Sequence, residues 1–170
     1  CARLCEIASW WKARTETTIE ISRMNQGTYE CVVNGPDGTT ILARNMEVYA
    51  PLSPWLKGYQ EVKANHFTFK SSILPIIGIS PATSKDLADF LRQSGYICET
   101  SPKRERYTYY IDQPDFGVSQ ELSMPAQIEE SGCSLLRLGR WPDSAQSALA
   151  ITGDIDAMTL WDYGLRFIGQ

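Results

Sequence analysis

The spacing of apolar and polar positions predicts one helix followed by strands in the first third of the chain. In residues 3–14, RLCEIASWWKAR, apolar side chains recur at helical spacing, so a short amphipathic helix is expected to pack on the segment after it. From residue 17 the period changes to two in TTIEISRM, TYECVVN and TTILAR, and turn-forming sequences separate these runs. Residues 1–50 therefore predict a helix plus an antiparallel β meander. One face of such a meander needs a cover, either the helix or a second sheet.

The rest of the chain changes character twice. Residues 51–70 carry prolines, a glycine and polar side chains, which predict a connecting excursion, and residues 71–170 predict a small α/β lobe. In this lobe ILPIIGIS is a short apolar strand, and SKDLADFLRQSGY has a helical apolar stripe that Gly95 ends. Further strands are expected at residues 96–99 and 107–112. The predicted fold class is α+β: an antiparallel β meander with a covering helix, followed by a small α/β lobe that shares its core.

Composition and charge narrow the possible functions. The chain is 43% hydrophobic and 21% charged, which lies in the range of globular proteins. A net charge of -4 provides no broad positive field, so nucleic acid is not an expected partner. No apolar stretch approaches the roughly 20 residues that span a bilayer, so no membrane span is expected. The chain begins with Cys1 instead of methionine, which suggests a fragment or a processed product and leaves the compartment open, with the cytoplasm favoured.

The common catalytic motifs are missing from the sequence. It contains no GxSxG, no GxxxxGK[ST], no HExxH and no GxGxxG before a helix. A Ser-His-Asp arrangement would have to use His66, the one histidine of the chain, which has no nucleophile motif around it. The five cysteines are an odd number without CxxC spacing, which favours reduced thiols over a disulfide framework or a zinc site.

Two carboxylates near the end of the sequence are the best candidates for chemistry. Asp154 and Asp156 follow the apolar run ALAIT, which predicts a buried strand. Acidic residues at the carboxyl end of a strand are where an α/β enzyme places a metal or a general base. The same residues could end a strand and cap the next helix, because aspartate is a favoured N-cap. The sequence leaves both interpretations open.

The terminal segment resembles a known family. RWP, a short polar spacer, SALAIT and D-x-D are similar to the opening of the catalytic domain of polysaccharide deacetylases, the NodB-homology family of carbohydrate esterases. The resemblance implies that Asp154 is a general base acting on a metal-bound water and that Asp156 is a ligand of a divalent, zinc-like metal. A bound cation lowers the pKa of water toward about 7, and a nearby carboxylate can then take its proton. The two histidine ligands of the family have no counterpart here, so this chain alone would not complete the site.

A broader resemblance covers nearly all of the chain. It rests on Trp10-Trp11, VNGPDG, IIGIS, DLADFLRQSGY and LGRWPDSAQSALAITGDIDAMTLWDYGLR, in that order. These blocks resemble the region after the catalytic barrel in long-form bacterial and archaeal polysaccharide deacetylases. The implied role is to support metal-dependent hydrolysis of N-acetyl or related groups on a polysaccharide or oligosaccharide, together with the remainder of a larger deacetylase chain. The alternative is a non-catalytic carbohydrate-binding or domain-packing module, in which exposed Trp55 and Tyr59 contact sugar.

Overall fold

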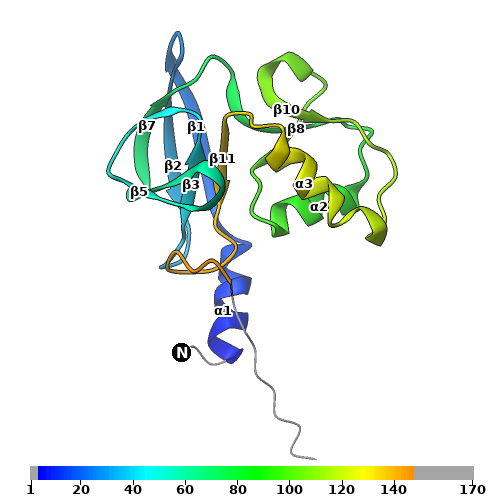
Figure 1. The fold of residues 1–170 in the computed structure, drawn as a ribbon, viewed down its shortest axis with the longest axis horizontal. Coiled ribbons are helices and arrows are strands. Elements are labelled where there is room, and N and C mark those ends of the chain that lie inside the picture. The colour runs from blue at the N-terminus through cyan, green and yellow to red at the C-terminus, as the bar shows by residue number, and fades with distance from the viewer. Residues whose placement is uncertain (1–3, 148–170) are drawn as a thin grey trace, which may run out of the picture.

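The computed structural model describes residues 4–147, which form an α+β fold with three sheets (Figure 1). The helices are α1 (Leu4–Arg14), α2 (Lys85–Gln93) and α3 (Ser123–Glu130), with single 3-10 turns η1 (Leu56–Gly58), η2 (Arg104–Arg106) and η3 (Val118–Gln120). The strands are β1 (Thr18–Asn25), β2 (Thr28–Asn34), β3 (Ile41–Arg44), β4 (Glu47–Tyr49), β5 (Leu52–Pro54), β6 (Tyr59–Val62), β7 (His66–Lys70), β8 (Leu74–Ile79), β9 (Cys98–Thr100), β10 (Tyr107–Ile111) and β11 (Leu135–Leu138). The expected fold class is confirmed.

Two four-stranded antiparallel sheets pack against each other. One has the order β1-β2-β7-β4 and the other the order β11-β3-β6-β5. Alternate residues of β2 point inward, and Cys31 and Phe69 of the first sheet meet Ala43, Val62 and Leu136 of the second in one core. The second sheet therefore covers the apolar face of the first.

A third sheet is parallel and joins the second sheet. Its order is β10-β8-β9, and α2 forms the crossover from β8 to β9. Ile77 of β8, Leu87 and Leu91 of α2 and Ile128 of α3 pack with Leu42 on the outer face of β3. All four residues of β3 are buried because sheets or helices cover both of its faces. Ile41 and Ala43 thus belong to one core cluster and Leu42 to the other, and the two clusters lie on opposite faces of β3.

The predicted meander is wrong in its third strand. β1 and β2 pair as expected, but the strand beside β2 on its other side is β7, whereas β3 lies in the second sheet between β6 and β11. β3 is apolar on both faces apart from Arg44, so it suits the doubly covered centre of a layered fold better than an outer sheet.

Residues 51–70 also differ from the expected connecting excursion. They contribute β5 and β6 to the second sheet and β7 to the first. Pro54 lies in β5, which is an edge strand, where a missing backbone N–H removes no bond between central strands. Proline and glycine therefore marked an edge strand and a turn, and most of this segment belongs to the sheets.

Helix α1 exists as predicted but does not cover the meander. It extends from one end of the two antiparallel sheets, and Arg14 is its one buried residue (Figure 1). Trp10 Nε1 donates to the carbonyl of Asp37 at 3.1 Å, and the ring of Trp11 lies edge-on to Trp141 with centroids 5.5 Å apart. None of the helices between residues 4 and 147 has the length and apolar character needed to cross a membrane.

Candidate functional site

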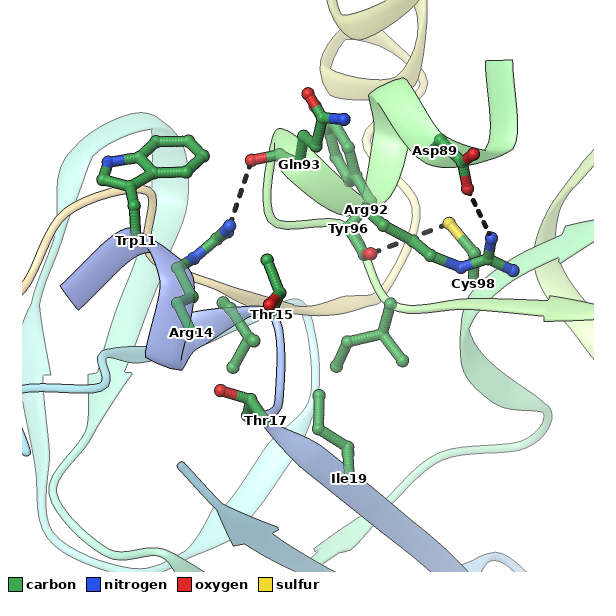
Figure 2. Close-up of a pocket in the computed structure, with 12 residues that line it drawn as sticks. Trp11, Arg14, Thr15, Thr17, Ile19, Asp89, Arg92, Gln93, Tyr96 and Cys98 are labelled. Carbon is green, nitrogen blue, oxygen red and sulfur yellow. Dashed lines mark hydrogen bonds and ion pairs between the residues drawn. The ribbon is translucent and has the colours of Figure 1, made fainter. Parts of the chain in front are cut away.

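A cavity of about 550 Å³ opens where α1 leads into β1 and faces the end of α2 (Figure 2). We call it the Arg14 cavity. It lies between elements that are far apart in the sequence. Its lining consists of Trp11, Arg14, Thr15, Thr17, Ile19, Asp89, Arg92, Gln93, Tyr96, Ile97, Cys98 and Leu138.

The local sequence places Arg14 beside an aromatic ring. Trp11 and Arg14 are three positions apart on α1 and so share a face of the helix. The guanidinium lies over the Trp11 ring, 5.2 Å from its centroid, which is a favourable cation–π geometry. Arg14 Nη1 donates to the carbonyl of Gln93 at 3.2 Å (Figure 2). This carbonyl belongs to the last turn of α2, where helix carbonyls lack partners within the helix.

The charge of Arg14 is not compensated by a carboxylate. The side chain is 7% exposed, and neither Nε nor Nη2 has a hydrogen-bond partner among residues 4–147. None of the ion pairs found in that part of the chain involves Arg14. Burial lowers the pKa of Arg14 from its ordinary value, and the positive charges of Arg137 and Arg140 lower it further. An unpaired buried charge is costly, so this position favours an anion nearby.

The remaining walls of the Arg14 cavity combine apolar and polar groups. Ile19, Ile97 and Leu138 supply aliphatic surface, while Asp89 and Arg92 form an ion pair at 3.3 Å on α2. The lining supports binding more than covalent chemistry: burial raises the pKa of Cys98 to about 12, so this thiol stays protonated at neutral pH and is a poor nucleophile.

A second hollow of about 610 Å³ continues from the Arg14 cavity along β1. The two share Ile19, Ile97 and Cys98 in their linings, so they form one groove between β1 and β9. Arg23 and Arg106 line the second hollow. Glu99 and Glu105 line it as well, and Glu99 pairs with Arg106 at 3.6 Å, so the charges of the second hollow balance.

A polar cluster around the partly buried carboxylate of Glu129 joins α3 to β3 and β11. Glu129 of α3 accepts from Arg44 at 2.7 Å through Oε2 and from Arg137 at 2.7 Å through Oε1. The hydroxyls of Tyr96 and Tyr59 donate to Oε1 at 2.8 Å and 3.2 Å. Oε1 of Glu129 is engaged by one arginine and two hydroxyls and Oε2 by the other arginine, so this carboxylate anchors α3 to the sheets.

The carboxyl ends of the parallel strands, where α/β proteins commonly bind ligands, are occupied by structural hydrogen bonds. Ser80 Oγ accepts from the backbone of Ala82, and Thr83 Oγ1 donates to the carbonyl of Ile111. Ser101 Oγ accepts from the backbone of Lys103. These hydroxyls fix the loops after β8 and β9 and are not presented to a ligand.

The residues proposed from the sequence have different outcomes. Asp154 and Asp156 lie outside the described residues. Tyr59 is not the exposed aromatic that was expected: it is 4% exposed, its hydroxyl bonds to Glu129, and the Arg44 guanidinium lies 4.8 Å from its ring centroid, so no sugar can stack on it. Trp55 is half-buried and packs against the core that contains α2 and α3.

The described residues contain no cluster of metal-binding side chains of their own. Among residues 4–147, no group of three or more histidine, cysteine, aspartate or glutamate side chains is placed to hold a metal ion. His66 is on the outside of the first sheet, where its Nε2 lies 2.8 Å from Oε1 of Glu30.

No protein-family model, curated protein or solved structure matches this chain. The geometry of the Arg14 cavity therefore carries the functional argument. Sequence reasoning had missed both Arg14 and Glu129. The i, i+3 spacing of Trp11 and Arg14 was a local signal for a cation–π pair on α1, whereas no local signal pointed to Glu129, because its partners come from strands far away in the sequence.

Proposed function

We propose that this chain is a non-catalytic carbohydrate-binding module within a polysaccharide-deacetylase-like protein. The observation that carries the proposal is the Arg14 cavity, in which an aromatic ring, a buried arginine and aliphatic side chains surround about 550 Å³. This volume is within the roughly 300–1,000 Å³ of small-molecule sites. Sugars present apolar C–H faces and polar edges, and a site with both kinds of surface suits them.

In such a protein the module would hold the glycan whose N-acetyl or related groups are hydrolysed. The groove along β1 has room for more than one sugar ring, which suits a polysaccharide or oligosaccharide. Only the family resemblance implies the hydrolysis, and on that resemblance the remainder of a larger chain carries it out. In that resemblance Asp154 is the general base and Asp156 a ligand of a divalent metal.

Two tryptophan variants test where the glycan binds. Binding of chitotetraose, of neutral cellotetraose and of acidic tetragalacturonate is measured by isothermal titration calorimetry. The unaltered chain is compared with Trp11→Ala and Trp55→Ala. We expect Trp11→Ala to weaken glycan binding at least tenfold and Trp55→Ala to leave it within about threefold, since a stacked aromatic contributes on the order of 1.5 kcal/mol. Loss of binding in Trp55→Ala alone would place the sugar on that half-buried ring instead, and no binding to any glycan would end the proposal.

The acidic pair is tested separately, in the longest available form of the chain. Asp154→Asn and Asp156→Asn should lower divalent-metal affinity and deacetylation of a chitooligosaccharide if the two aspartates act as the resemblance implies. Unchanged metal affinity and unchanged deacetylation in both variants would leave a capping role for these residues.

One surface observation favours domain packing as a second candidate function. Val118 and Leu122, four positions apart around η3, are 82% and 88% exposed. Large apolar side chains exposed together often mark protein contacts. Substituting both by serine should weaken association with the remainder of a longer chain, measured by pull-down of separately expressed parts, and should leave glycan binding unchanged. Unaltered association would count against this surface.

A further inference from the structure

We propose that the Arg14 cavity selects a ligand with a carboxylate, such as a uronic-acid unit of a glycan, and that the carboxylate pairs with the Arg14 guanidinium. The inference rests on the proposed carbohydrate-binding function and adds the chemical class of the sugar. Two features of the described residues support it: the free edge of the guanidinium and the charge around it.

The free edge of Arg14 has the geometry that a carboxylate uses. Nη1 is engaged with the carbonyl of Gln93, whereas Nε and Nη2 have no partner among residues 4–147. These two nitrogens lie on one side of the planar guanidinium. Two parallel N–H groups on one edge meet the two oxygens of a carboxylate in the bidentate arrangement that makes arginine–carboxylate pairs strong.

The charges around the cavity leave a local excess of positive charge. Arg92 is paired with Asp89 at 3.3 Å, and Arg137 is paired with Glu129 at 2.7 Å. Arg14 has no such carboxylate partner in the described part of the chain. The positive charge of Arg140 also acts on Arg14, and Arg140 takes part in none of the ion pairs found there. In a chain of net charge -4, this cavity is therefore a local site for an anion.

The Arg14 side chain must shift for a carboxylate to reach its free edge. Nε and Nη2 are covered, and Nη2 faces Gly95, where an added β-carbon would lie 3.2 Å from it. Among residues 4–147 the guanidinium makes one hydrogen bond, to the carbonyl of Gln93, so this bond and the contact with the Trp11 ring oppose the shift. Binding of the carboxylate exchanges a cation–π contact for a charge-assisted pair with two hydrogen bonds. The intrinsic fluorescence of the protein should change as the guanidinium leaves the Trp11 ring.

The test compares a charged and an uncharged sugar of equal length. Tetragalacturonate and cellotetraose are titrated into the full chain, with calorimetry and tryptophan fluorescence as readouts. We expect tetragalacturonate to bind at least tenfold more tightly, with a preference that falls as salt rises, and with a fluorescence change that cellotetraose does not produce. Arg14→Gln should reduce the preference to less than threefold, and Arg14→Lys, which keeps the charge and loses the fork, should retain part of it.

Arg104→Gln is the matched control, because Arg104 is an exposed arginine that lines neither the Arg14 cavity nor the hollow that continues from it. It should change the affinity for tetragalacturonate by less than threefold. Each variant is checked by its urea unfolding curve. If Arg14→Gln does not fold, the salt dependence and the tetragalacturonate preference of the unaltered chain still decide the question.

The possible results distinguish a failure of this inference from a failure of the proposed carbohydrate-binding function. If both tetrasaccharides bind with equal affinity and Trp11→Ala loses this binding, the proposed selectivity for a carboxylate is wrong and the carbohydrate-binding function stands. Binding of free galacturonate or succinate, lost in Arg14→Gln, with no binding of either tetrasaccharide, would support the anion site and overturn its carbohydrate ligand. Tighter binding of inorganic phosphate than of galacturonate would overturn the choice of a carboxylate.

Discussion

The variant Glu129→Gln tests whether one buried carboxylate holds α3 against the second sheet. Glu129 has 11% of its side chain exposed and is bonded to two arginines and two tyrosines. Glutamine has nearly the same shape, but it removes the negative charge and turns one oxygen into an amide donor. That amide would face either Arg44 at the position of Oε2, or Arg137 and the tyrosines at the position of Oε1.

The expected loss in free energy of unfolding is about 3 kcal/mol. Removing one partner of a buried ion pair costs roughly 3–5 kcal/mol because the other charge is left uncompensated. The lower end is expected here because both arginines keep backbone acceptors. Arg44 donates to the carbonyls of Cys133 and Glu129 at 3.1 Å and 3.2 Å, and Arg137 donates to the carbonyl of Ser94 at 2.9 Å.

Urea unfolding followed by tryptophan fluorescence measures this loss. Glu130→Gln is the control, because Glu130 is the next residue of α3 and is exposed; it should change the free energy of unfolding by less than about 0.5 kcal/mol. With a typical stability of about 5–15 kcal/mol, Glu129→Gln should shift the midpoint clearly. A loss below about 1 kcal/mol with an unchanged m-value would refute the reasoning, since the cluster would then carry no net electrostatic stabilisation.

Three further predictions concern single side chains. Burial, together with the charge of Glu129, raises the pKa of Tyr59 above the roughly 10 of an unfolded chain. The protonated hydroxyl of Tyr59 therefore stabilises the folded state below about pH 10, and this stabilisation is lost as the pH rises. Tyr59→Phe should flatten the fall in urea midpoint above about pH 9. Burial raises the pKa of Cys31 to about 12, so iodoacetamide at pH 8 should label exposed Cys5 at least tenfold faster than Cys31 by mass spectrometry, and equal rates would contradict the burial. Gly95 has φ +97°, and a β-carbon there would clash with the carbonyl oxygen of Leu138. Gly95→Ala should therefore lower the free energy of unfolding by more than about 2 kcal/mol, and an unchanged urea midpoint would refute this.

The candidate site was only partly accessible to sequence reasoning. The Trp10-Trp11 pair and its helix were evident, but the partner surface was not. The side chain of Arg14 donates to the carbonyl of Gln93 at the end of α2, and these two residues are 79 positions apart in the sequence. Tyr59 looked exposed because its neighbours Lys57, Gly58 and Gln60 are polar or small, whereas β6 places it facing α3. A side chain's neighbours along the chain say little about burial once both faces of a sheet are covered.

What the sequence determined by itself is local structure and fold class. The period-two runs at β1 and β2, the apolar run of β8 and the stripe of α2 are each confirmed, because hydrophobic periodicity is set by neighbours a few positions away. The tertiary structure decided which strands pair, that β3 crosses to the second sheet, and that Arg44 meets Glu129 across 85 positions. These contacts form only when the sheets and helices pack against one another. The spacing of residues within a single segment does not encode which distant segment it will meet.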